Sequence, residues 1–185
     1  MKTCAMVVLL AVLAAPASAA VIHNEAVNGD LSSNAAAPTP LAFALGGNTI
    51  IGTTTSTDRD FIRFTIGPNQ VLNALNLLVY SPDNLSFAAF NAGVTSYVPS
   101  GTTNAFFLSG IHISGGDLGS DLMPLFVSSA VTTYSLAAPQ LDPGDYCFII
   151  QQTNPILQSY SLEFVVEGIV PTESSTWGAV KALYQ

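Results

Sequence analysis

Two groups of oxygen-bearing side chains carry most of the ligand chemistry in this sequence. Glu25, Asn28 and Asp30 lie within HNEAVNGDLS, and Asp58 and Asp60 lie within DRDFIRFTI. Calcium prefers carboxylate, amide and backbone carbonyl oxygens, and it takes about six to eight of them. Each group could therefore supply ligands to a calcium ion, although neither has the spacing of an EF-hand loop and each alone is a weak signal.

A purely structural role for the same acids is the alternative. Asp58 and Asp60 stand at the start of an apolar run, next to Arg59 and Arg63. Acids in such a place flank a turn and form ion pairs with nearby arginines. An exposed pair of this kind contributes only about 0–1 kcal/mol. The sequence leaves both interpretations open.

The sequence lacks the residue patterns of an enzyme. Its two histidines are His23, beside the expected signal cleavage point, and His112 in GIHIS, which alternation places on a strand surface. There is no G-x-S-x-G elbow, H-E-x-x-H motif, phosphate loop or C-x-x-C pair. A pair of distant carboxylates, as in glycosidases, is the one catalytic arrangement left open. We expect a protein that is not an enzyme.

Strands must position these residues, because short apolar runs alternate with turn residues along the whole body of the chain. In residues 160–167, Tyr160, Leu162 and Phe164 alternate with polar side chains, which predicts one packed face and one wet face. Gly46-Gly47, between two apolar runs, predicts a tight hairpin. Residues 132–136 read as a further short strand. The pattern predicts an all-β fold, a single jelly-roll-like β-sandwich of about 8–9 antiparallel strands, with a short C-terminal helix.

The N-terminal residues predict secretion. Lys2 precedes an apolar run over residues 5–15 that is too short to cross a bilayer, which needs about 20 residues. Ala17-Ser18-Ala19 then has the A-x-A pattern of signal peptidase cleavage, after Ala19 or Ala20. We predict a signal peptide over residues 1–19, an extended lead-in over 20–40, the sandwich over 41–168 and a tail with a short helix over 169–185. No later segment is expected to cross a membrane, and we expect the protein outside the cell or at its surface.

Charge and cysteine content exclude two classes of protein. Twelve acids face four basic residues, one of which is Lys2 in the signal segment. This surface repels nucleic acid and anionic membranes, whose binding depends on clustered lysine and arginine. Cys4 is lost with the signal, so Cys147 cannot form an internal disulfide. We expect Cys147 to pack inside a strand, with an intermolecular disulfide as the alternative.

The order of the motifs resembles that of the bacterial pre-peptidase C-terminal domain. The matching pieces are EAVNGD, LGGNTIIG, DRDFIRF, GDYCFIIQQ and YSLEFVV, which together span residues 24–167. GSDLMP, FIIQQT and the VPTESSTW of the tail also resemble secreted bacterial proteins with C-terminal sorting tags. The resemblance implies a small, non-catalytic jelly-roll sandwich of the kind appended to secreted enzymes. In related collagen-binding modules a calcium ion joins the lead-in to acids at a strand entry, and the matching positions here are Glu25, Asn28, Asp30, Asp58 and Asp60.

These observations predict a secreted, non-catalytic β-sandwich module, stabilised by calcium, that binds a glycan or a protein outside the cell. The alternative is a structural subunit that self-associates into an extracellular layer or fibre. A free N-terminal strand can add to the sheet edge of a neighbouring molecule, which is a common mode of β-strand recognition.

Overall fold

Alternation of apolar and polar residues produces nine β-strands in the described part of the chain, which is residues 19–82, 84–97 and 106–169 of the computed structural model. In chain order these strands are β1 (Ala20–Asn24), β2 (Thr39–Pro40), β3 (Gly46–Thr54), β4 (Arg59–Ile66), β5 (Gln70–Ser81), β6 (Ser86–Ala92), β7 (Ser109–Ile113), β8 (Gly144–Gln152) and β9 (Gln158–Gly168). The same residues form two short α-helices, α1 (Glu25–Asn28) and α2 (Met123–Ser128), and the 3-10 helix η1 (Gly115–Asp117).

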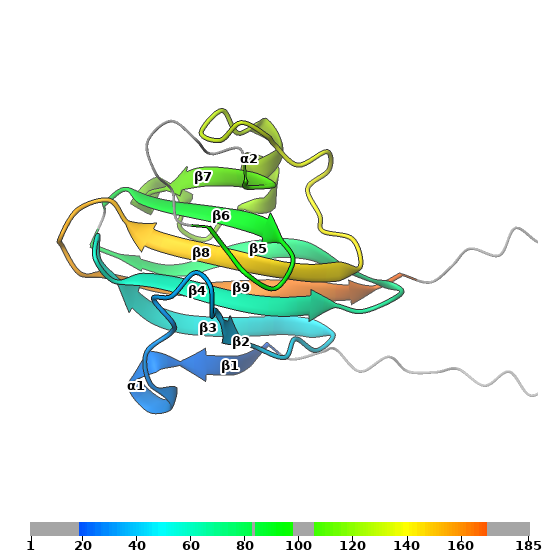
Figure 1. Cartoon of the computed structure of the whole chain (residues 1–185), viewed down its shortest axis with the longest axis horizontal. Helices are drawn as coiled ribbons and strands as arrows, with labels where there is room; N and C mark the ends of the chain where they lie inside the picture. The colour runs from blue at the N-terminus through cyan, green and yellow to red at the C-terminus, as the bar shows by residue number, and fades with distance from the viewer. Residues whose placement is uncertain (1–18, 83, 98–105, 170–185) are drawn as a thin grey trace, which may run out of the picture.

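The strands form two facing sheets (Figure 1). Sheet A has the order β1-β3-β9-β5, and sheet B has the order β2-β4-β8-β6-β7. Along the chain, β3, β4, β5 and β6 alternate between the two sheets, and all pairings among β3 to β9 are antiparallel. The predicted all-β, jelly-roll-like sandwich is therefore confirmed.

The lead-in over residues 20–40, which we call the N-terminal arm, is more structured than predicted. It contributes β1 to one edge of sheet A, the single turn α1, and β2 to the edge of sheet B. Both of its strands run parallel to their neighbours, β3 and β4. Between them Leu31, only 2% exposed, packs into the core. The arm therefore crosses from one sheet to the other and closes one side of the sandwich.

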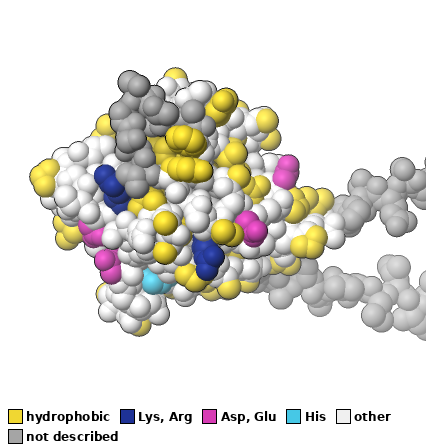
Figure 2. Space-filling model, in the orientation of Figure 1, with side chains coloured by type: hydrophobic (Ala, Val, Ile, Leu, Met, Phe, Trp, Pro, Cys, Tyr) yellow, Lys and Arg dark blue, Asp and Glu magenta, His cyan; other side chains and the backbone are white. Residues whose placement is uncertain are grey.

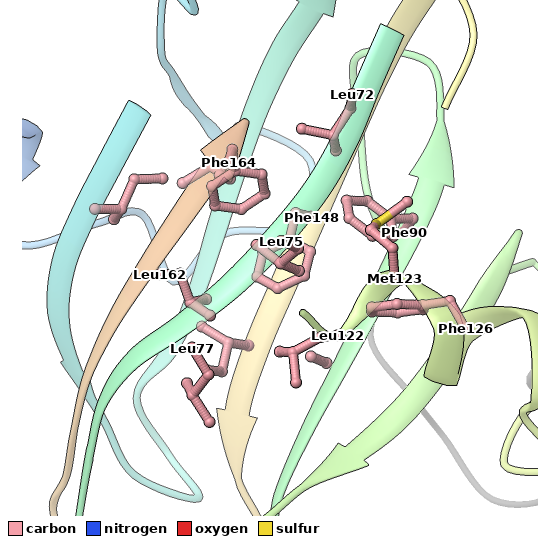
Figure 3. Packing of buried hydrophobic residues seen from close by; sticks show 14 of the residues in the cluster. Leu72, Leu75, Leu77, Phe90, Leu122, Met123, Phe126, Phe148, Leu162 and Phe164 are labelled. Carbon is pink, nitrogen blue, oxygen red and sulfur yellow. The ribbon is translucent and has the colours of Figure 1, made fainter. Parts of the chain in front are cut away.

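Leucine and phenylalanine side chains from both sheets fill the space between them (Figure 3). Phe164 of sheet A meets Phe148 of sheet B edge to face, with ring centroids 5.3 Å apart. From α2, Met123 and Phe126 add to the same cluster. Fully burying one such side chain contributes about 1.5–3 kcal/mol, so this cluster is the main source of stability.

The two ends of the described chain lie at the same end of sheet A. Ala20 starts β1 opposite Asn48, and β9 ends beside the start of β3, where Val166 lies opposite Gly46. At the other end of the sheet, β1 finishes and α1 begins (Figure 1). Thr53 of β3, opposite Ser159, also lies at that end.

Two predictions about single residues are confirmed. Cys147 is buried in β8, where its thiol donates to the carbonyl oxygen of Gly93 at 3.3 Å and burial raises its pKa to about 11. His112 is exposed on β7.

The predicted signal peptide and C-terminal helix lie outside the described residues. Among the residues described, no helix has the length and apolar character needed to span a membrane.

Candidate metal centre

The first candidate residue, Glu25, is positioned by a single helical turn. Asn24 caps α1, because its side-chain oxygen accepts from the backbone N–H of Ala26 at 3.1 Å. The N–H of Asn24 in turn donates to Oδ1 of Asn28 at 2.8 Å. The turn ends at Gly29, whose φ of 89° favours glycine. The side-chain oxygen of Asn28 therefore takes part in local capping, and its predicted role as a calcium ligand stays a prediction.

Glu25 joins the arm to the body of the sandwich. Its Oε2 accepts from the backbone N–H of Thr53 at 2.7 Å and from the Thr53 hydroxyl at 3.2 Å. Its Oε1 accepts from the N–H of Leu31 at 3.3 Å. Burial raises the pKa of Glu25, while the bonds from Thr53 oppose that shift. The carboxylate is thus fixed at the boundary between β3 and the arm.

Asp60 is a carboxylate inside an otherwise apolar space. It lies on β4 with only 1% of its surface exposed, and its Oδ2 accepts from the hydroxyl of Tyr160 at 2.7 Å. Its Oδ1 is buried and has no hydrogen-bond partner. Burial, and then the nearby charge of Glu25, raises the pKa of Asp60 to about 9. A buried, incompletely paired carboxylate is costly, so a bound proton or a cation must compensate it.

Glu25, Asp30 and Asp60 together form a group that could hold a metal ion. One carboxylate oxygen from each lies within 4.8 Å of the others. Two ligands at about 2.3–2.6 Å from one calcium ion can be at most about 5 Å apart, so the spacing fits. Two of the acids belong to the arm and one to the sandwich, and Asp30 is exposed. On the face drawn in Figure 2, charged side chains are sparse, and acidic ones lie both near the end that carries α1 and toward the opposite end.

A buried water is a poorer partner for the unpaired oxygen of Asp60. A cavity of about 10 Å³ adjoins this side chain, which is the smallest size that holds one water. Its lining is apolar except for Asp60 and Tyr160. A buried water typically makes about three hydrogen bonds, and this lining offers too few polar groups. A cation between the carboxylates meets the charge of the site better.

Asp58 lies beside the three acids without joining them. It closes the turn between β3 and β4, where its carbonyl oxygen accepts from the N–H of Thr55 at 2.9 Å. Burial, and then the charge of Asp30, raises its pKa, and Asp58 in turn helps to raise the pKa of Asp60. The charges that shift Asp60 are therefore other carboxylates. Neither Arg59 nor Arg63 is among the causes of these shifts, and Nε of Arg59 is buried without a hydrogen bond.

Three residues of the site were not predicted from the sequence. Tyr160, on β9, bonds to Asp60 from the opposite sheet. Gly52, opposite Tyr160 on β3, leaves the space that the phenol occupies. His23 is buried in β1, and its Nε2 donates to the carbonyl of Gly29 at 3.0 Å. This bond fixes the segment of the arm that links Glu25 to Asp30. The last glycine of LGGNTIIG was the available signal for Gly52.

Replacing Gly52 by alanine is expected to destabilise the protein by about 1–3 kcal/mol, because overpacking shifts the neighbouring groups. A Cβ at this position would lie 2.6 Å from the hydroxyl oxygen of Tyr160 and 3.1 Å from Cδ of Glu25. Urea unfolding of Gly52→Ala measures the loss. Gly116→Ala is the matched control, since its new Cβ would meet only Oγ of Ser114 at 3.5 Å. Equal stability of the two variants would contradict the close approach at Gly52.

The class of protein follows from the fold and the site. No family model, curated protein or solved structure matches this chain. The chain is an all-β sandwich whose N-terminal arm closes one side and meets the body at a group of acids that could hold a metal ion.

Proposed function

We propose that this protein is a secreted, non-catalytic β-sandwich module that binds a ligand outside the cell, and that a calcium ion fixes its N-terminal arm. The observation that carries the proposal is the buried carboxylate of Asp60, whose Oδ1 has no hydrogen-bond partner and which has one oxygen within 4.8 Å of carboxylate oxygens of Glu25 and Asp30. Three acids from two separate parts of the chain repel one another unless a cation or protons neutralise them. An ion at this point would convert that repulsion into a link between arm and body.

The donor set favours calcium among the common cations. All three candidate side chains offer carboxylate oxygens, which suit hard cations and not zinc or copper. Magnesium demands near-ideal octahedral geometry, whereas calcium accepts irregular sites. Extracellular modules use calcium sites with dissociation constants of about 10⁻⁴–10⁻³ M. The resemblance to pre-peptidase C-terminal domains supports the same choice, because the related collagen-binding modules hold calcium between the lead-in and the acids at the strand entry.

The placement of the histidines supports a role without catalysis. His23 is committed to the carbonyl of Gly29. His112 lies on β7, at the far edge of sheet B from β2 and the arm. Neither histidine is placed to exchange protons at a ligand bound beside the three acids.

Calcium is expected to raise the melting temperature of the purified protein by several degrees relative to EDTA. An ion that binds only the folded state stabilises it by about 2.7 kcal/mol at 100 times its dissociation constant. Asp30→Ala should remove the calcium response and leave stability in EDTA nearly unchanged, because Asp30 is exposed. Differential scanning calorimetry measures both.

The matched control is Asp142→Ala, which removes an exposed acid in the turn before β8, at the other end of β4 from Asp60. This variant should keep the full calcium response. Superimposed melting curves of the unaltered protein in calcium and in EDTA would count against the ion. Magnesium should give the smaller shift.

A self-associating structural subunit is the second candidate. β1 is an edge strand of sheet A, its sequence AVIHN has no charged residue, and Val21 is exposed. Edges of this kind can pair with another chain, since they lack lysine or proline as protection. Light scattering at rising protein concentration separates the two candidates, and a uniform monomer would speak against assembly.

A further inference from the structure

An open cleft of about 530 Å³ lies next to the group of acids. Its lining includes Glu25 and Asp30 from the arm. The remainder comes mainly from β3, β9 and β5, which are neighbours in sheet A, namely Ile51, Gly52, Thr53, Ser159, Tyr160, Ser161 and Val79. Ile51 and Ser161 alternate with the core residues Ile50 and Leu162, so the cleft lies on the outer face of the sheet.

The lining of the cleft suits a neutral molecule with both hydroxyl and C–H surfaces. Ser159 can donate and accept hydrogen bonds, and the Thr53 hydroxyl, which donates to Glu25, can still accept one. Ile51 and Val79, the latter 48% exposed, offer apolar contact. The volume is within the range of about 300–1,000 Å³ that is typical of small-ligand sites.

An ion held by the acids would have coordination positions left for a ligand. Glu25, Asp30 and Asp60 supply three carboxylates, whereas calcium takes about six to eight oxygens. Asp30 is exposed and lines the cleft, so the free positions would open on that side. Two neighbouring hydroxyl groups of one molecule can replace two water ligands of calcium.

Charge decides which hydroxyl-bearing ligand fits. The three carboxylates outweigh a divalent ion by one negative charge, and the chain as a whole carries a net charge of −8. A uronate or a phosphate would be repelled, whereas a neutral sugar would not. We propose that this cleft binds a neutral sugar whose vicinal hydroxyls complete the coordination of the calcium ion. The inference rests on the calcium site of the proposed function and names the ligand class for it.

Titration of the purified protein with methyl α-D-mannopyranoside and methyl β-D-galactopyranoside tests the inference. Isothermal calorimetry in calcium should show binding of at least one of them, weakened about tenfold or more in EDTA. A fully O-methylated mannoside, which has no free hydroxyl, should not bind. Sugar binding that persists unchanged in EDTA would overturn the role of the ion.

A pair of variants separates the sugar from the ion. Ser159→Leu fills the cleft from β9 and should abolish sugar binding while the calcium-dependent rise in melting temperature remains. Ser128→Leu, at an exposed position of α2, is the matched control and should bind sugar normally. If calcium stabilises the protein but neither sugar binds, the proposal of sugar binding is overturned and the proposed calcium site stands. If calcium has no effect and no sugar binds, both proposals fail.

A cationic ligand gives the opposite dependence on calcium. An ammonium group would compete with the ion for Glu25 and Asp30, so its binding would strengthen in EDTA. Methylammonium is a simple probe of this outcome. If methylammonium binds more tightly in EDTA and no sugar binds in calcium, the proposal of a sugar ligand is overturned in favour of a cationic ligand.

Discussion

In calcium-free buffer, the free energy of unfolding is expected to fall by several kcal/mol as the pH rises from about 4 to about 9. Asp60 has its pKa raised to about 9 by burial and by Glu25, whereas an unfolded aspartate titrates near its ordinary value of 3.8. Between these values the folded state binds one more proton than the unfolded state. Stability is therefore full below the unfolded pKa and is lost as the pH approaches the folded pKa, by at most about 1.4 kcal/mol per unit.

Calcium should flatten this profile, because the ion compensates the ionised carboxylates that are otherwise destabilising. Urea unfolding at a series of pH values, in calcium and in EDTA, measures the difference. Asp60→Asn should give a much flatter profile without calcium and no response to the ion, since the amide can still accept from Tyr160 but carries no charge; the raised pKa values of Glu25 and Asp58 leave a smaller slope. Asp142→Asn is the control and should retain the slope. A flat calcium-free profile of the unaltered protein would contradict the protonated, buried state of Asp60.

Replacing Leu31 by alanine is expected to reduce the free energy of unfolding by about 2–5 kcal/mol. Leu31 is the side chain of the arm that enters the main core, and it directly follows Asp30. Its loss should therefore also weaken calcium binding, because the arm carries two of the three acids. Chemical denaturation gives the first quantity, and the calcium concentration at half-maximal stabilisation gives the second.

Leu75→Ala provides the comparison for Leu31. Leu75 is fully buried in β5, outside the arm, and its truncation should cost a similar amount of stability. Calcium affinity should be unchanged in this variant. An equal loss of calcium affinity in both variants would mean that the affinity depends on the overall stability of the sandwich and not on how the arm is held.

The strands with one packed face were predictable from local sequence. In β9, Tyr160, Leu162 and Phe164 are buried as the alternation indicates, because one face of the strand meets the opposite sheet. Gly46 and Gly47 misled the prediction. They start β3 and form no hairpin. Gly46 has a φ of 96°, which favours glycine, and a Cβ on Gly47 would meet Oε1 of Glu163 on β9. The pairing of β3 with β9 is not visible in local sequence.

A side chain that bonds in place of backbone pairing explains a second wrong prediction, the strand expected over residues 132–136. Residues 132–136 looked like a strand but form none. The hydroxyl of Thr132 instead accepts from the N–H of Gly110 at 2.8 Å and donates to the carbonyl of Tyr134. A threonine hydroxyl can form hydrogen bonds of this kind in place of the backbone pairing of a sheet.

The candidate site was predictable in composition but not in geometry. The acids were visible because charge is scarce in this chain. Asn28 looked like a ligand, yet its oxygen serves the local turn. Tyr160 lies 100 residues from Asp60, so their bond follows only from the way the two sheets face each other. The parallel docking of the arm is equally a property of the assembled sandwich.

The positions of Ala20 and Gly168 have a practical consequence for presentation of the molecule. Both lie at one end of sheet A, while Glu25 and Thr53 lie at the other. The rise per residue of a strand separates the two ends by about 20 Å. A support, tag or neighbouring domain joined at Ala20 or Gly168 would leave the open cleft uncovered. Immobilisation through Ala20 or Gly168 is therefore suitable for binding assays. Labels intended to report on the cleft belong at the other end of sheet A, near Glu25 and Thr53.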